Sequence, residues 1–155
     1  MDHLDQVPFI DIYPFVTLII TLQSSGDVFV FNQIETNVWM TSGSFNAGPE
    51  ETSFGNHIAY DNVTHTVMIS SLTNVYLYSL DQIKDISNHH NIGPIFVGPL
   101  DVIEFDYEVA NIVMGHNYAM ISLSGKENDH IKCNYVSIYS LGIGEYQINY
   151  TYCYC

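Results

Sequence analysis

Two short apolar runs recur along the chain at a nearly constant spacing. Residues 20–31 align without gaps to residues 67–78, at an offset of 47 positions. A third copy is split into residues 119–122 and 136–141, which stand 52 and 61 positions beyond their counterparts in the second copy. The nine-residue difference is an insertion, and its polar residues 124–130 predict a loop. Similarity at this period is typical of solenoids and propellers.

Each copy predicts two strands joined by a turn, and neighbouring apolar segments predict a strand on either side. The preceding strands are expected at 54–60 and 108–114, and the following strands at 37–41, 92–97 and 146–152. Four strands per repeat is the pattern of a propeller blade. We therefore expect an all-β single domain over 1–155, with about three four-stranded antiparallel blades of a β-propeller at 7–46, 52–100 and 101–155. A two-layer β-sandwich is the alternative, because turns every 8–12 residues or so fit it too.

The predicted third strand of each copy is largely apolar on both faces. The alternating pairs are Val28/Val30 with Phe29/Phe31, Val75/Leu77 with Tyr76/Tyr78, and Val136/Ile138 with Ser137/Tyr139. A sheet with one wet face would alternate apolar with polar residues, so this pattern favours sheets stacked on both sides. Propellers usually carry about four to eight blades. We therefore expect further blades, from the same or another chain, to cover the outer faces.

The composition supports β-structure and limits the classes of partner that the chain can bind. Tyr and Phe number 12 and 8, whereas residues that favour helices are scarce. Seventeen acidic residues face three lysines and no arginine, giving a net charge of −14. Such a chain repels phosphate backbones, which excludes nucleic acid as a partner and favours a basic protein or cations. The apolar run 12–22 contains Pro14 and is too short for a membrane helix, and the acidic N-terminus has no signal-peptide pattern.

Residues 53–60, 66–69 and 74–78 resemble the FG-GAP repeats of integrin-α-type propellers. Phe54 and Gly55 open the motif, and Trp39 stands where such repeats place a tryptophan in the preceding outer strand. The resemblance implies an extracellular or cell-surface adhesion-type protein. The chain departs from the pattern at residues 70–72, which replace Gly-Ala-Pro, and at 107–108, which replace Phe-Gly. The family's calcium loop, an Asp-x-Asp-x-Asp-Gly series, does not occur, so calcium binding is not carried over.

Three cysteines lie near the C-terminus. A hairpin loop at residues 142–144 would place Cys133 opposite Cys153, close enough for a disulfide. A register shifted by two positions would select Cys155 instead, and three reduced cysteines packed as small apolar side chains are the other possibility.

Candidate chemical groups are few. His89 and His90 lie near Asp85 in a segment, 81–93, that we expect to be a loop. Adjacent histidines in a strand point to opposite faces, so a solvated loop is favoured over a metal site. The acidic groups are Glu50 with Glu51, Asp129 with His130, and the trio Glu104, Asp106 and Glu108. The trio favours an exposed strand edge over a cation site.

No nucleophile or phosphate-binding motif is present, and no cofactor is expected. Asn62 and Asn149 head glycosylation sequons, which matter only if the chain is secreted. We expect a non-enzymatic interaction module that presents loops, such as 46–52 and 124–129, to a protein or glycan partner. The alternatives are a structural subunit buried in a larger complex and a metal-dependent hydrolase or lyase that uses rim carboxylates.

Overall fold

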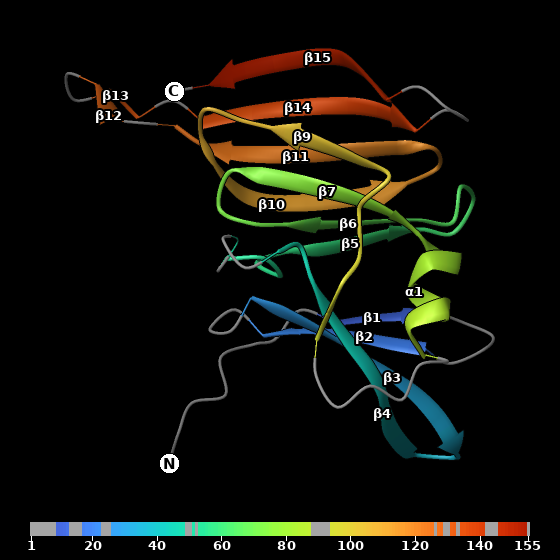
Figure 1. The fold of residues 1–155 in the computed structure, drawn as a ribbon. Coiled ribbons are helices and arrows are strands. Elements are labelled where there is room, and N and C mark those ends of the chain that lie inside the picture. Colours follow the sequence, from blue (N-terminus) through green and yellow to red (C-terminus); the bar gives the residue numbers. More distant parts are fainter. Residues whose placement is uncertain are drawn as a thin grey trace.

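The computed structural model describes residues 9–12, 17–22, 26–48, 51, 53–87, 94–125, 127–128, 131–132, 134–141 and 146–154. Across these residues the chain is mostly β-structure with one short helix, which confirms the all-β prediction. Three sheets follow one another along the chain (Figure 1). We name them sheets A, B and C.

Each sheet contains a four-stranded antiparallel meander. Sheet A is formed by β1 (Phe9–Ile12), β2 (Thr17–Leu22), β3 (Asp27–Glu35) and β4 (Val38–Asn46). Sheet B is formed by β5 (Ile58–Asp61), β6 (Thr66–Ser70), β7 (Asn74–Ser79) and β9 (Asp101–Glu104). Sheet C is formed by β10 (Glu108–Gly115), β11 (Tyr118–Ser124), β14 (Asn134–Leu141) and β15 (Tyr146–Tyr154). The copies found in the sequence thus occupy the second and third strands of the three sheets.

Two features depart from the predicted strand plan. The fourth strand of sheet B is β9 and not the segment 92–97, so sheet B extends beyond the predicted end at residue 100. The segment 92–97 instead contributes β8 (Ile95–Phe96), which pairs in parallel with β4 at the edge of sheet A. The predicted insertion carries a small ribbon of β12 (Glu127–Asn128) and β13 (Ile131–Lys132), where a loop alone was expected.

The sheets stack face to face, so that sheet B is covered on both sides. One buried cluster joins sheets A and B, and includes Val28, Val30, Val67, Ile69 and Tyr78. A second joins sheets B and C, and includes Met68, Val75, Leu77, Ile121 and Tyr139. The fold therefore has three layers, in contrast to the two-layer sandwich considered as an alternative. The described sheets do not close into a ring.

The segment 80–87 is helix α1 (Leu80–Ser87), where the sequence led us to expect a loop from residue 81. A capping box begins it: the Gln82 backbone N–H donates to Ser79 Oγ at 3.2 Å, and the Ser79 N–H donates to Gln82 Oε1 at 2.9 Å. Ile83 and Ile86 are buried between sheets A and B. Gly43 of β4 makes room for the helix, because a Cβ there would stand 2.9 Å from the Ile86 carbonyl oxygen.

The register between β14 and β15 differs from the predicted one. Tyr135 pairs with Cys153, whereas the hairpin expected from residues 142–144 placed Cys133 opposite Cys153. The ladder also shifts between Ile138 and Tyr139, where Asn149 is the extra residue on β15. The observed register is the shift of two positions that makes Cys155 the predicted partner of Cys133. Cys133 and Cys155 themselves lie outside the described residues.

Candidate functional site: a loop surface at one end of sheets B and C

Connections from all three sheets meet at one end of the stack, which we call the loop end. It includes the described parts of 47–57, which link β4 to β5, together with the turn 71–73 and the connection 105–107 between β9 and β10. The ribbon β12–β13 lies at the same end, on the left in Figure 1. Both segments proposed as contact loops from the sequence, 46–52 and 124–129, therefore belong to this end so far as they are described.

Glu51 anchors the β4–β5 connection to sheet B. Its carboxylate accepts a hydrogen bond of 2.5 Å from the Tyr76 hydroxyl, and the Asn74 amide lies 3.5 Å from the same oxygen. Burial raises the pKa of Tyr76, and its hydrogen bond to Glu51 raises it further. Glu51 therefore acts as a structural acceptor, because its oxygens are occupied by neighbouring side chains.

Phe54 and Gly55 carry the resemblance to FG-GAP repeats. They form a turn at the loop end and precede β5 instead of opening the strand. The Phe54 ring is fully buried and lies edge-on to the rings of Phe45, Tyr76 and Tyr78, with centroids 5.2–6.2 Å away. Gly55 has a φ of 94°, which side chains rarely tolerate, and its N–H donates to the Ser70 carbonyl oxygen at 2.9 Å. Gly55 therefore combines a positive φ with a close approach to the backbone of Ser70.

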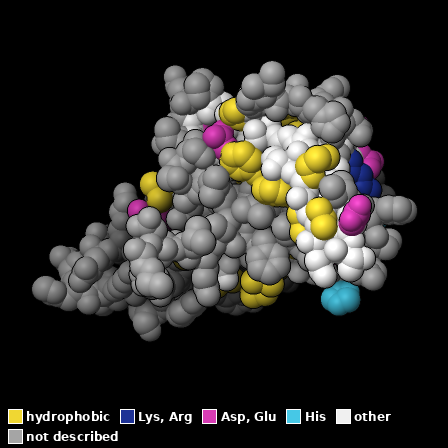
Figure 2. Space-filling view, turned by 90° about the horizontal axis from the view of Figure 1, so that it is seen from below, with side chains coloured by type: hydrophobic (Ala, Val, Ile, Leu, Met, Phe, Trp, Pro, Cys, Tyr) yellow, Lys and Arg dark blue, Asp and Glu magenta, His cyan; other side chains and the backbone are white. Residues whose placement is uncertain are grey.

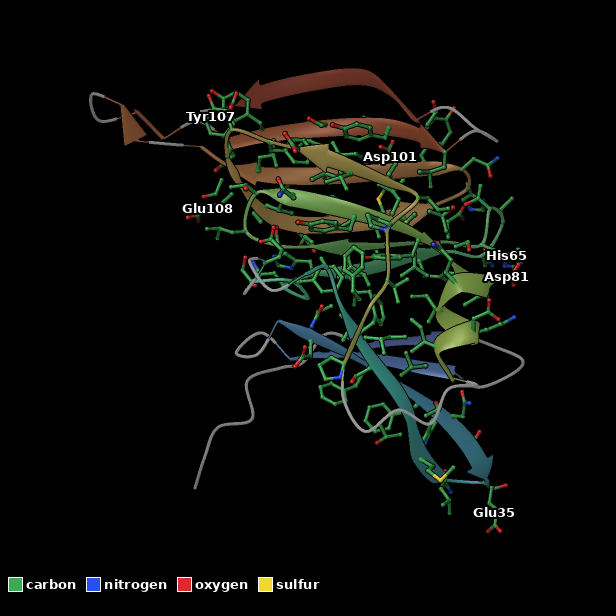
Figure 3. All side chains as sticks on the ribbon, in the orientation of Figure 1. Glu35, His65, Asp81, Asp101, Tyr107 and Glu108 are labelled. Atoms are coloured by element: carbon green, nitrogen blue, oxygen red, sulfur yellow. The ribbon has the colours of Figure 1, made fainter. Side chains whose placement is uncertain are left out.

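The loop end combines exposed carboxylates with half-buried aromatic rings. Glu104, Asp106 and Glu108 are all exposed, and Tyr107 between them stacks on Tyr135 with ring centroids 4.6 Å apart. Figure 3 shows Tyr107 and Glu108 both at this end. The trio does not lie on one strand, because Glu104 ends β9 and Glu108 begins β10. The result is an acidic surface with a stacked tyrosine pair.

The opposite end, which we call the turn end, is built around a buried carboxylate. Asp61 is 1% exposed and accepts hydrogen bonds from the Thr64 N–H at 3.1 Å and the Thr64 hydroxyl at 2.7 Å. Burial alone would raise its pKa, but these bonds, with others from the backbone of Val63 and Asn117, hold the pKa below its ordinary value. Since Asn117 belongs to the β10–β11 turn, Asp61 ties sheet B to sheet C.

His57 is a half-buried titratable group at the contact between sheets B and C. Burial lowers its pKa, although a hydrogen bond with the Val109 backbone acts in the opposite direction. Its backbone N–H donates to Ser70 Oγ at 3.0 Å. No sequence signal pointed to His57, Asp61 or the pairing of Glu51 with Tyr76, because their partners are distant in the chain or lie in the backbone.

The remaining predicted residues are dispersed. Trp39 lies near the β3–β4 turn and is partly exposed, Asn62 is exposed in the β5–β6 turn, and Asp85 is exposed on α1. Asn149 lies in β15, whose side chains are not described. His89, His90, Glu50, Asp129 and His130 fall outside the described residues. Within the described part of the chain, no three His, Cys, Asp or Glu side chains converge as a metal site would require.

Neither a scan of protein-family models nor a search of curated proteins finds a match. The one described helix, α1, is too short to cross a membrane.

Proposed function

We propose that this chain is a non-enzymatic interaction module, in which three propeller blades present the loop end to a protein partner with a basic surface. The observation that carries the proposal is the set of exposed carboxylates Glu104, Asp106 and Glu108, at the same end as the half-buried Tyr107–Tyr135 stack. Carboxylates steer a cationic partner, and tyrosines supply rigid contact area at small entropic cost. The FG-GAP resemblance supports an extracellular or cell-surface setting as part of the same proposal.

The packing of the sheets supports the propeller architecture. The first strands of neighbouring sheets contact one another, β1 with β5 and β5 with β10. The outer strand β4 of sheet A splays away from sheet B, and α1 fills the wedge between them (Figure 1). Sheets that meet at their first strands and diverge outward are arranged like blades around an axis.

The proposal is tested by removing charge at the loop end without changing the fold. The variant E104Q/D106N/E108Q removes three exposed carboxylates, and E35Q/D81N/D85N removes three others that are also exposed. Figure 3 shows Glu35 and Asp81 far from Glu108. The two variants therefore have equal net charge and differ in where the charge is lost.

Binding of a decalysine peptide, followed by fluorescence anisotropy at two salt concentrations, gives the readout. Exposed ion pairs contribute about 0.2–1 kcal/mol each, so the loop-end variant should bind roughly tenfold more weakly. The control variant should bind nearly as well as the unmodified chain. Equal losses in both variants would show that only net charge matters, and the loop end would then not be the binding surface. If a panel of immobilised neutral glycans binds and decalysine does not, the partner class is wrong.

Val113 and Met120 are exposed apolar side chains of sheet C, and they favour a second candidate function, that of a structural subunit within a larger assembly.

A further inference from the structure

The three sheets repeat the same polarity from one to the next. We call the face that carries Val75 and Leu77 the forward face of sheet B, and the face that carries Tyr76 and Tyr78 its backward face. The faces of sheets A and C are named from the aligned residues, so Val28 and Val30 lie on the forward face of A and Tyr139 lies on the backward face of C. The forward face of A packs on the backward face of B, and the forward face of B packs on the backward face of C. The molecule therefore contains two examples of one kind of contact, forward face on backward face.

The forward face of sheet C has the same apolar character but no sheet against it among the described residues. Met120 occupies the repeat position of Met68, yet Met120 is 48% exposed and Met68 is 0% exposed. Val113 and Ile138 are the cross-strand neighbours of Met120 on β10 and β14, and Val113 is 58% exposed. An apolar row thus runs across three strands at positions whose counterparts in sheet B are covered by another sheet.

The backward face of sheet A is the matching surface at the other end of the stack. Phe29 and Phe31 occupy the repeat positions of Tyr76 and Tyr78, which are buried, but both phenylalanines are only half-buried. Phe31 pairs with Thr41 and Gln33 pairs with Trp39, which places Trp39 on this same face. Figure 2 views the molecule from this end, and hydrophobic side chains reach the surface there.

We infer that the forward face of sheet C binds the backward face of sheet A in a second copy of this chain. The occupant is argued from continuity with the contacts inside the chain. Neither face is covered by another sheet among the described residues, and each is the counterpart of a face that is buried inside the chain. A contact between unlike faces closes into a ring or continues as a filament. Two copies with two such contacts form a closed ring of six sheets, within the range of about four to eight found in propellers. The ring size rests on the proposed propeller architecture, whereas the pairing of faces does not.

The mass of the full chain in solution, from size-exclusion chromatography with light scattering, tests the inference. The unmodified protein should elute at twice the chain mass of 17.6 kDa. Met120→Asp and Val113→Asp, two alternative changes on the forward face of C, should each halve that mass. Val63→Asp changes an exposed apolar residue in the β5–β6 turn and should leave the mass unchanged. Circular dichroism confirms that each variant is folded.

A mixing experiment separates this contact from one between two identical faces. Trp39→Asp, on the backward face of A, should also give a species of single chain mass. A mixture of the Met120→Asp and Trp39→Asp variants should recover the double mass, because one intact pair of unlike faces remains. No recovery, or a Trp39→Asp variant that keeps the double mass, would overturn the pairing.

An unmodified protein of single chain mass would overturn the choice of a second copy and assign the face to a different chain or to further sequence. A mass that grows with concentration would overturn the closed ring. Either result leaves decalysine binding at the loop end unaffected, so the two proposals fail separately.

Discussion

The buried carboxylate of Asp61 gives the sharpest prediction on stability. Asp61→Asn keeps the size of the side chain but removes its charge and one of its two acceptor oxygens. Oδ2 accepts both bonds from Thr64, and the Asn117 backbone supplies a further bond from sheet C. A single amide oxygen cannot serve all these donors, so at least one buried N–H or hydroxyl loses its partner.

The magnitude follows from the number and kind of bonds lost. A hydrogen bond to a charged group contributes about 1.5–3 kcal/mol, and we expect the free energy of unfolding to fall by about 2 kcal/mol at pH 7. The folded pKa of Asp61 lies below its ordinary value of 3.8. The carboxylate therefore stabilises the fold fully above about pH 5, and this stabilisation is lost as the pH falls through the folded pKa.

Urea denaturation followed by circular dichroism, at one chain concentration, measures the effect at several pH values from 7 down to 3. The difference between the unmodified chain and Asp61→Asn should be largest at pH 7 and should shrink as the pH falls below 4. Asp106→Asn, at an exposed carboxylate, is the matched control and should differ from the unmodified chain by less than about 0.5 kcal/mol. A difference that stays constant with pH, or one no larger than that of the control, would refute this account.

Two other predictions concern the core and the cysteines. Phe54→Ala should lower the free energy of unfolding by about 3–5 kcal/mol because the ring is buried against three others, whereas Phe96→Ala, at an exposed ring, should cost well under 1 kcal/mol; urea denaturation compares them. If the oxidised protein forms a disulfide, the observed register favours Cys133 with Cys155, so that non-reducing peptide mapping should find the cross-link in Cys153→Ser and lose it in Cys155→Ser. A cross-link that survives only in Cys155→Ser would contradict the register.

The repeated strands of sheet B were predictable because they are packed on both faces. Val75 with Leu77 and Tyr76 with Tyr78 face different sheets, and this demand leaves an apolar pattern in the chain itself. Helix α1 was also within reach, since Ser79 and Gln82 form a capping box ahead of Ile83. We predicted a loop from the polar residues around Asp85 and did not use the capping box.

The rest depended on contacts that local sequence does not encode. The two residues of β8 form a strand only because the edge of β4 is available to them. Glu51 and Tyr76 are 25 residues apart and meet because the loop end folds back on sheet B. Asp61 appears in the sequence only as part of a polar turn, and its link to sheet C comes from the backbone of Asn117 in the β10–β11 turn.

The parallel pairing of β8 with β4 also determines when sheet A can be completed during synthesis. Its last edge is covered by Ile95 and Phe96, and its buried face is covered by β6, β7 and α1, all of which follow it in the chain. As the chain leaves the ribosome, β1–β4 therefore wait with an open edge and an uncovered apolar face until about fifty further residues have emerged. Sheets A and B should consequently fold as one cooperative unit, and a nascent chain that stops before β8 is the form most exposed to chaperones and to aggregation.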